Sequence, residues 1–236
     1  MARAPRNKTA AARPAPSSLP RPFIFVLAGV NGAGKSSVGG ALLAEHGLSW
    51  FNPDTFAREL AARLGLAVEE ANARAWEHGR ALLERAIAEG RSHAFETTLG
   101  ARTIPALLAR AAGTHDVVMI FCGLSSPALH LERVRFRVAH GGHDIPEAKI
   151  RERWTASRAN LIRLLPVLAR LQVFDNSAPA AADGSIPDPR LVLEMAAEQV
   201  LFPAADDAGT LAGTPAWARA IVQAALELDT AGPRGA

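Results

Sequence analysis

The sequence is poor in cysteine and in long apolar runs. Cys122 is the only cysteine among 236 residues, so no intrachain disulfide can form and a reducing cytoplasm is the expected compartment. It lies in an apolar run, which favours a packing role over a catalytic thiol. No apolar run reaches the length of a membrane span, so we expect a soluble protein without a membrane partner.

Acidic residues are absent from the first 22 residues, which also lack the continuous apolar core of a secretory signal. Because this stretch is rich in Ala, Pro and Arg, we interpret residues 1–22 as a disordered tail. The tail contains five basic residues, and the whole chain has a net charge of +3, so the remaining chain carries about −2. A body without a basic excess argues against nucleic acid as a partner.

An apolar strand followed by a glycine-rich loop is the most informative stretch of the chain. Phe23–Ala28 is a short run of strand formers that leads into Gly29, four residues, Gly34, Lys35 and Ser36. In this P-loop pattern backbone N–H groups cradle phosphates, the lysine reaches the β- and γ-phosphates, and the hydroxyl binds Mg²⁺. We therefore expect ATP or GTP with Mg²⁺. The residues expected to bind the nucleotide are Gly29, Asn31, Gly32, Ala33, Gly34, Lys35, Ser36 and Ser37.

Strands and helices are predicted to alternate along the rest of the chain. The further strands are expected over residues 48–51, 92–95, 116–123, 171–174, 191–195 and 200–202. The helices are expected over residues 37–45, 56–64, 68–89, 104–112, 127–140, 147–165 and 215–228. This order predicts an α/β protein with a three-layer P-loop NTPase or kinase fold and a mostly parallel sheet. We expect that domain over residues 23–205, with residues 206–236 forming a C-terminal helix and a loose end.

Polar residues follow two of these strands, at the edge of the sheet where ligands bind in such folds. Asp54 follows the strand at residues 48–51, and it either caps the next helix or takes part in catalysis. Glu96, Thr97 and Thr98 follow the strand at residues 92–95. A carboxylate and two hydroxyls suit a hydroxyl-rich substrate or a water molecule on Mg²⁺. The alternative is that the threonines only cap the strand end.

The predicted helix over residues 127–140 is divided by charge, with an apolar stripe on one face. A second face carries His130, Arg133, Arg137 and His140. Arginines aligned in this way suit triphosphate oxygens, although a solvated face is the alternative. Residues 141–146 are expected to hinge a lid, and Arg153 lies on one face of the helix that follows.

With these motifs the chain resembles the zeta toxin family of P-loop kinases, in particular its chromosomal, toxin-like branch. The resemblance covers residues 23 to about 202 and rests on GVNGAGKSS, FNPDTFA, AFETTL, RVRFRVAHGGHDIP and FDNS in this order. It implies phosphorylation of a UDP-N-acetylamino sugar, such as UDP-N-acetylglucosamine, by ATP or GTP with Mg²⁺. An antitoxin protein is the partner that the toxins of this family imply.

The resemblance also implies roles for single residues. Asp54 matches the proposed general base, and Lys35 and Ser36 match the phosphate and magnesium ligands. Glu96 with Thr97 matches a substrate-side element. The arginines that resemble the lid and transition-state group are Arg133, Arg137 and Arg153, with Arg135 and Arg151 close enough in sequence to exchange roles with them.

The leading hypothesis is therefore a kinase that transfers the γ-phosphate to a sugar hydroxyl. A nucleotide-dependent switch or ATPase that acts on a protein partner is the alternative from another class, although a switch would need no carboxylate beside the P-loop. A kinase of another small hydroxyl acceptor and a polynucleotide kinase are further alternatives, and the last would need a basic groove.

Overall fold

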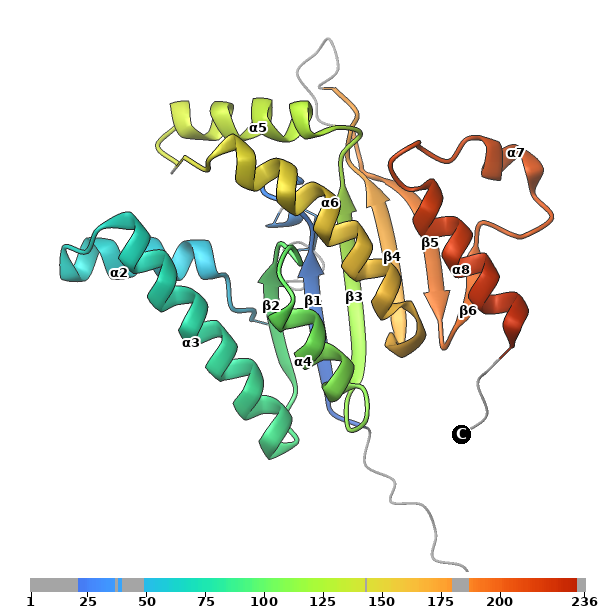
Figure 1. The fold of residues 1–236 in the computed structure, drawn as a ribbon, viewed down its shortest axis with the longest axis horizontal. Coiled ribbons are helices and arrows are strands. Elements are labelled where there is room, and N and C mark those ends of the chain that lie inside the picture. Colours follow the sequence, from blue (N-terminus) through green and yellow to red (C-terminus); the bar gives the residue numbers. More distant parts are fainter. Residues whose placement is uncertain (1–20, 37, 40–48, 143, 180–186, 233–236) are drawn as a thin grey trace, which may run out of the picture.

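A single mixed sheet forms the centre of the protein (Figure 1). The computed structural model describes residues 21–36, 38–39, 49–142, 144–179 and 187–232. Within these residues the strand order is β2-β1-β3-β4-β5-β6. The strands are β1 (Phe23–Ala28), β2 (His93–Thr97), β3 (Asp116–Gly123), β4 (Arg170–Asp175), β5 (Arg190–Ala196) and β6 (Gln199–Phe202). The first four pair in parallel and the last two are antiparallel, which confirms the predicted α/β fold with a mostly parallel sheet.

The helices follow the strands in the predicted order, apart from the short helix α7, which the sequence analysis did not predict. They are α2 (Pro53–Leu64), α3 (Val68–Glu89), α4 (Thr103–Ala111), α5 (Pro127–Ala139), α6 (Glu147–Leu164), α7 (Ala208–Ala212) and α8 (Arg219–Ala231). Lys35, Ser36 and residues 38–39 are helical. The rest of the helix predicted over residues 37–45, which includes Ser37, lies outside the described residues. Residues 1–20 of the predicted tail also lie outside them. In the described part of the chain, no helix is long and apolar enough to cross a membrane.

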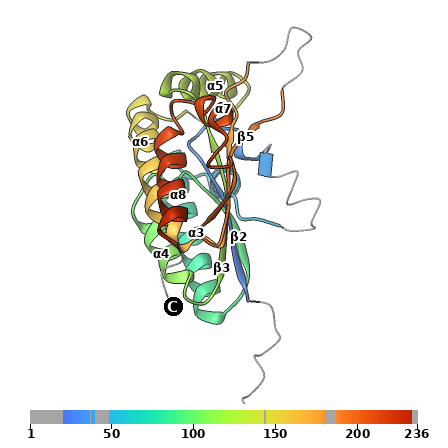
Figure 2. The ribbon, with the colours of Figure 1, turned by 90° about the vertical axis from the view of Figure 1, so that its right-hand side faces the viewer.

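Alternate residues of the central strands pack on opposite faces of the sheet. On one face Ile24 and Val26 belong to the main core, which α3, α4, α6 and α8 cover (Figure 2). Phe25 and Leu27 belong to a smaller core on the other face. A Cβ on Gly39 would lie 2.0 Å from Leu27 Cδ2, so the helical segment after the P-loop covers this second face. The sheet is therefore the middle of three layers.

Cys122 is buried in the smaller core, as the apolar run predicts. Burial raises the pKa of its thiol to about 12, with a smaller opposing effect of Lys35. A thiol with this pKa stays protonated at neutral pH and is a poor nucleophile, so its role is packing.

Two predicted elements differ from the structure. Of the strand expected over residues 48–51, the described residues 49–51 form one bridge, in which Phe51 N donates to Ala94 O and Phe51 O accepts from Glu96 N, each at 2.9 Å. Asn52 then caps α2 and turns the chain away from the sheet. The helix expected from residue 215 begins at Arg219, because residues 215–218 form a turn closed by a hydrogen bond from Ala218 N to Pro215 O.

Candidate active site

The loop after β1 has a backbone shape that depends on glycine. Gly29, Gly32 and Gly34 have φ angles of 142°, 81° and 84°. A Cβ would lie 2.3 Å from Cys122 O at Gly29, and 2.3 Å from Asn176 Nδ2 at Gly34. Positive φ angles and close contacts together exclude larger residues at these positions. This backbone fits the anion-binding loop that the sequence pattern predicts.

Glu96 is the centre of a buried polar cluster at the carboxyl end of β2. Its Oε1 lies 3.2 Å from Lys35 Nζ, and the two side chains are only 8% and 7% exposed. Its Oε2 accepts hydrogen bonds from Ser36 Oγ at 3.0 Å and from Asn52 Nδ2 at 2.9 Å. The buried carboxylate is thus ion-paired and hydrogen-bonded, as a buried charge requires. The cluster brings three predicted site residues together, and Asn52 joins them as a contact that the sequence analysis missed.

Asp54 lies in the first turn of α2, but it does not cap the helix. The N-cap is Asn52, whose Oδ1 accepts from the N–H groups of Asp54 at 2.9 Å and Thr55 at 3.1 Å. Asp54 Oδ2 lies instead 3.9 Å from Arg137 Nη1, with each side chain 38% exposed. The capping alternative is therefore wrong, and the Asp54 carboxylate lines the cleft in front of the P-loop.

This phosphate cleft is a cavity of about 850 Å³ between the P-loop, the start of α2 and α5. Arg133 and Arg137 line it from α5, which lies across the carboxyl ends of β1 and β3 (Figure 1). Arg153 approaches from α6, and its Nη1 donates to Asn31 Oδ1 at 2.8 Å. The two neighbours considered as exchange partners, Arg135 and Arg151, are exposed and face Glu147 on the surface.

Two residues that were given no role hold the P-loop in place. Asn176, after β4, donates from Nδ2 to Ala33 O at 3.0 Å. His130 is buried, and its Nδ1 donates to the Asn31 carbonyl at 2.8 Å. The sequence feature that could have indicated this role of His130 is its position on the same face of the predicted helix as Arg133 and Arg137.

Burial lowers the pKa of His130 to about 4, although the hydrogen bond to Asn31 acts in the opposite direction. The positive charges of Lys35 and Arg133 lower this pKa further. The imidazole is therefore neutral at neutral pH, and it joins α5 to the P-loop as a hydrogen-bond donor.

We expect His130 to make the folded protein less stable in acid. The unfolded chain, with an ordinary histidine pKa of 6.5, binds this proton more readily than the folded chain, whose pKa is about 4. Stability is thus complete above pH 6.5 and decreases as the pH falls towards 4, by about 2 kcal/mol at pH 5. Urea unfolding of the wild type and of His130→Gln at pH 7.5 and pH 5 tests this effect. Between pH 7.5 and pH 5, the wild type should lose about 2 kcal/mol more of its free energy of unfolding than His130→Gln does. A difference that does not change with pH would contradict the prediction.

A second cavity, of about 420 Å³, adjoins the phosphate cleft. The walls of both cavities include Asn31, Phe51, Asp54 and Glu96. Most of the remaining walls of this second cavity come from one face of α3, the segment after β2 and the residues around the start of α6. Part of α3 therefore lines a cavity, while Leu83 and Ala86 of the same helix pack in the core. Asp54 thus lies where the two cavities meet.

Thr97 and Thr98 line the second cavity and also stabilise the turn after β2. The Thr97 hydroxyl oxygen accepts from Leu99 N at 3.0 Å, and that of Thr98 accepts from Gly100 N at 3.4 Å. Each hydroxyl proton can still be donated, because these contacts use only the oxygen as acceptor. Both interpretations of the threonines are therefore compatible with their positions.

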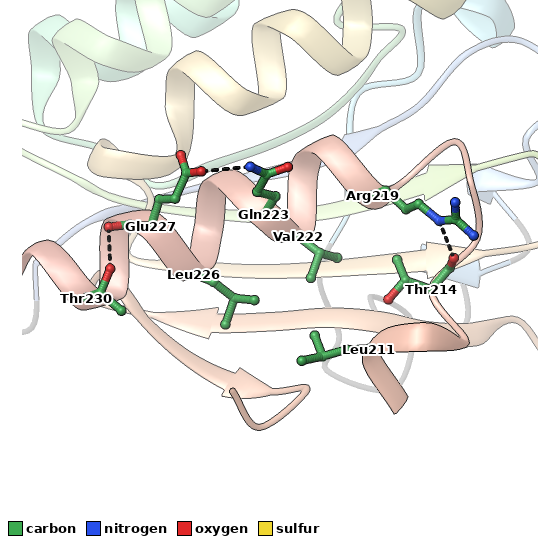
Figure 3. Close-up of a pocket in the computed structure, with 8 residues that line it drawn as sticks. All are labelled: Leu211, Thr214, Arg219, Val222, Gln223, Leu226, Glu227 and Thr230. Carbon is green, nitrogen blue, oxygen red and sulfur yellow. Dashed lines mark hydrogen bonds between the residues drawn. The ribbon is translucent and has the colours of Figure 1, made fainter. Parts of the chain in front are cut away.

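A third cavity, of about 410 Å³, lies beside α8, and none of its lining residues lines the two cavities above (Figure 3). Leu211, Val222 and Leu226 form its apolar part. Its polar side chains are paired within the wall: Arg219 Nε with Thr214 O, Gln223 Nε2 with Glu227 Oε1, and Thr230 Oγ1 with Glu227 O (Figure 3). We find no arrangement for phosphate chemistry in this cavity.

The glycine-rich loop lies between a parallel strand and a helical turn, and its lysine and serine contact a carboxylate of the adjacent strand. These features define a P-loop kinase fold. Residues 24–161 match the family described as AAA domain (AAA_33), and the chain belongs to this family. No curated protein matches the chain.

Several solved structures are similar. The AvrRxo1-ORF1:-ORF2 complex with ATP has a TM-score of 0.58 and 18% identity, and the match covers 76% of this chain and 60% of that one. The same complex with sulphate ions has a TM-score of 0.58 and 19% identity, covering 84% and 64%. A structure of the PezAT chromosomal toxin–antitoxin system of Streptococcus pneumoniae has a TM-score of 0.49 and 16% identity, covering 73% and 72%. The chain thus spans less than two thirds of the first two relatives, and the likeness shows the fold alone.

Proposed function

We propose that this protein is a small-molecule kinase that transfers the γ-phosphate of ATP or GTP to a hydroxyl of a sugar nucleotide such as UDP-N-acetylglucosamine. One observation carries the proposal: the Asp54 carboxylate lines both the phosphate cleft and the adjoining cavity. A general base at this junction serves an acceptor hydroxyl from one cavity and a triphosphate in the other. A nucleotide-dependent switch would not need a carboxylate in this position.

The nucleotide side of the proposed site consists of the P-loop, Lys35 and Ser36. Lys35 would pair with the β- and γ-phosphates, and the Ser36 hydroxyl would hold Mg²⁺. When bound, this ion neutralises charge on the phosphates. Glu96 Oε2, 3.0 Å from Ser36 Oγ, is well placed for a water molecule of that ion, so its contacts favour the magnesium side over the sugar side.

The acceptor side consists of Asp54 and the two threonines, and three arginines surround the transferred group and the P-loop. Asp54 accepts the proton of the acceptor hydroxyl while the hydroxyl oxygen bonds to the γ-phosphorus and the bond to the β-phosphate oxygen breaks. Arg133 and Arg137, which line the phosphate cleft, stabilise the charge of the transferred group. Arg153 holds the P-loop through Asn31, and Thr97 and Thr98 offer hydroxyls to the acceptor.

Phosphorus NMR tests this proposal. The wild type is incubated with ATP, Mg²⁺ and UDP-N-acetylglucosamine, and in parallel with N-acetylglucosamine, UDP-glucose or no acceptor. The expected result is a new phosphomonoester signal that requires an acceptor. Decay of ATP to ADP and free phosphate at the same rate in all samples would refute the sugar-nucleotide substrate and leave a kinase of another hydroxyl acceptor or a switch. A signal only with another acceptor would keep the kinase and change its substrate.

A further inference from the structure

One face of α3 lines the second cavity. Its residues in that wall follow helical spacing, so they form a single stripe along the helix. They are Asn72, Ala75, Trp76, Gly79 and Arg80. Gly79 allows a close approach here, because a Cβ would lie 2.5 Å from Phe51 Cε1. The same helix is buried through other residues, including Leu83 and Ala86, so α3 serves both the core and the cavity.

Trp76 is the large apolar side chain of this stripe, and it is 46% exposed. Of the exposed large hydrophobic residues in the described part of the chain, Trp76 alone lines one of the two connected cavities. The Arg80 guanidinium carbon lies over the indole, 5.7 Å from its centroid, and Arg80 Nη1 pairs with Glu84 at 2.7 Å. The indole is thus supported by its own helix while much of its surface remains accessible.

The other walls of the cavity combine apolar residues, such as Phe51 and Leu99, with polar ones. Thr97 and Thr98 contribute hydroxyls from the end of β2, and Lys149 and Glu152 contribute charged groups from α6. An aromatic face in the same cavity as hydrogen-bonding groups suits a ring whose faces carry C–H groups and whose edge carries hydroxyls. An open-chain hydroxyl compound has no flat face to place on an indole.

We propose that Trp76 is the residue that recognises the acceptor ring: a cyclic, hydroxyl-bearing compound stacks on its indole, with one hydroxyl directed to Asp54. The placement of that hydroxyl rests on the proposed kinase function. The stacking itself is a binding event, so it can be measured without phosphoryl transfer. Trp76 then determines specificity for cyclic over open-chain acceptors.

The test compares Trp76→Ala, Trp76→Leu and Trp76→Phe with the wild type. Saturation-transfer NMR titrations use UDP-N-acetylglucosamine and N-acetylglucosamine as cyclic probes and sorbitol as the open-chain probe. We expect the Ala and Leu variants to bind the cyclic probe about 10-fold more weakly and the Phe variant to stay within about threefold, because only Phe keeps an aromatic face. Val68→Ala, an exposed position on the same helix that lines neither cavity, should bind like the wild type.

Kinetic constants separate this inference from the proposed function. If transfer occurs, Trp76→Ala should raise KM for the acceptor about 10-fold and leave kcat and KM for ATP within about twofold. Unchanged acceptor KM, equal behaviour of the Leu and Phe variants, or no binding of either cyclic probe would overturn the role of Trp76. Trp76-dependent binding without any transfer would refute the kinase and leave the ring-recognition site standing.

Discussion

Replacing Asp54 with asparagine is expected to lower phosphoryl transfer by about 10²- to 10⁴-fold, the usual contribution of a general base. Nucleotide affinity should change little, because the P-loop and Lys35 are the proposed phosphate ligands. The fold should also survive, since Asn52 and not Asp54 caps α2. The contact with Arg137 at 3.9 Å is loose and partly exposed, so its loss should cost well under about 1 kcal/mol. Single-turnover transfer, ATP titration calorimetry and thermal unfolding measure the three quantities.

Glu59→Gln is the matched control for this experiment. Glu59 belongs to the same helix and lines the phosphate cleft but not the second cavity. Removing its charge should therefore leave the transfer rate within about twofold of the wild type. If transfer depended only on the negative charge in the cleft, Asp54→Asn and Glu59→Gln would lower the transfer rate alike. Full transfer in Asp54→Asn would assign the base to another group. An equal loss of transfer and ATP affinity would assign Asp54 to nucleotide binding.

Much of the fold could be predicted because its signals are local. The apolar run of β1 and the glycines after it are contiguous, and the bounds of α3 and β3 agree with those predicted from periodicity and glycine stops. The prediction of a strand over residues 48–51 was wrong, because the length of a strand pairing depends on where the chain turns. The Asn52 side chain caps α2 and ends that pairing after one residue.

The contacts of the site are the part that local patterns do not specify. Asn31 is bonded by His130, 99 residues later, and by Arg153, 122 residues later. Helical spacing shows that His130 shares a face with the arginines, but it does not show which loop this face meets. Trp76 illustrates the same limit: periodicity identifies stripes on α3, whereas the neighbours of each stripe depend on the tertiary structure.

Lys35→Met should have two large and separable effects. ATP affinity should fall by about 10²-fold or more, because the variant lacks the cation proposed to pair with the β- and γ-phosphates. The protein should also lose about 3 kcal/mol of stability, since Glu96, only 8% exposed, loses its ion pair at 3.2 Å. We choose the low end of the usual range because Ser36 and Asn52 still donate hydrogen bonds to that carboxylate. Urea unfolding and ATP titration calorimetry measure the two losses.

The double variant Lys35→Met/Glu96→Gln separates the two effects. A neutral amide needs no counter-ion, so the double variant should regain most of the lost stability while ATP affinity stays low. Arg74→Gln is the control for an exposed pair: Arg74 and Glu70 lie 2.7 Å apart but are about half exposed, and breaking this pair should cost about 0.5 kcal/mol or less. If the double variant bound ATP like the wild type, Lys35 would not be the phosphate ligand. If Lys35→Met were as stable as the wild type, the buried pair would contribute nothing to the fold, and Glu96 would be held by Ser36 and Asn52 alone.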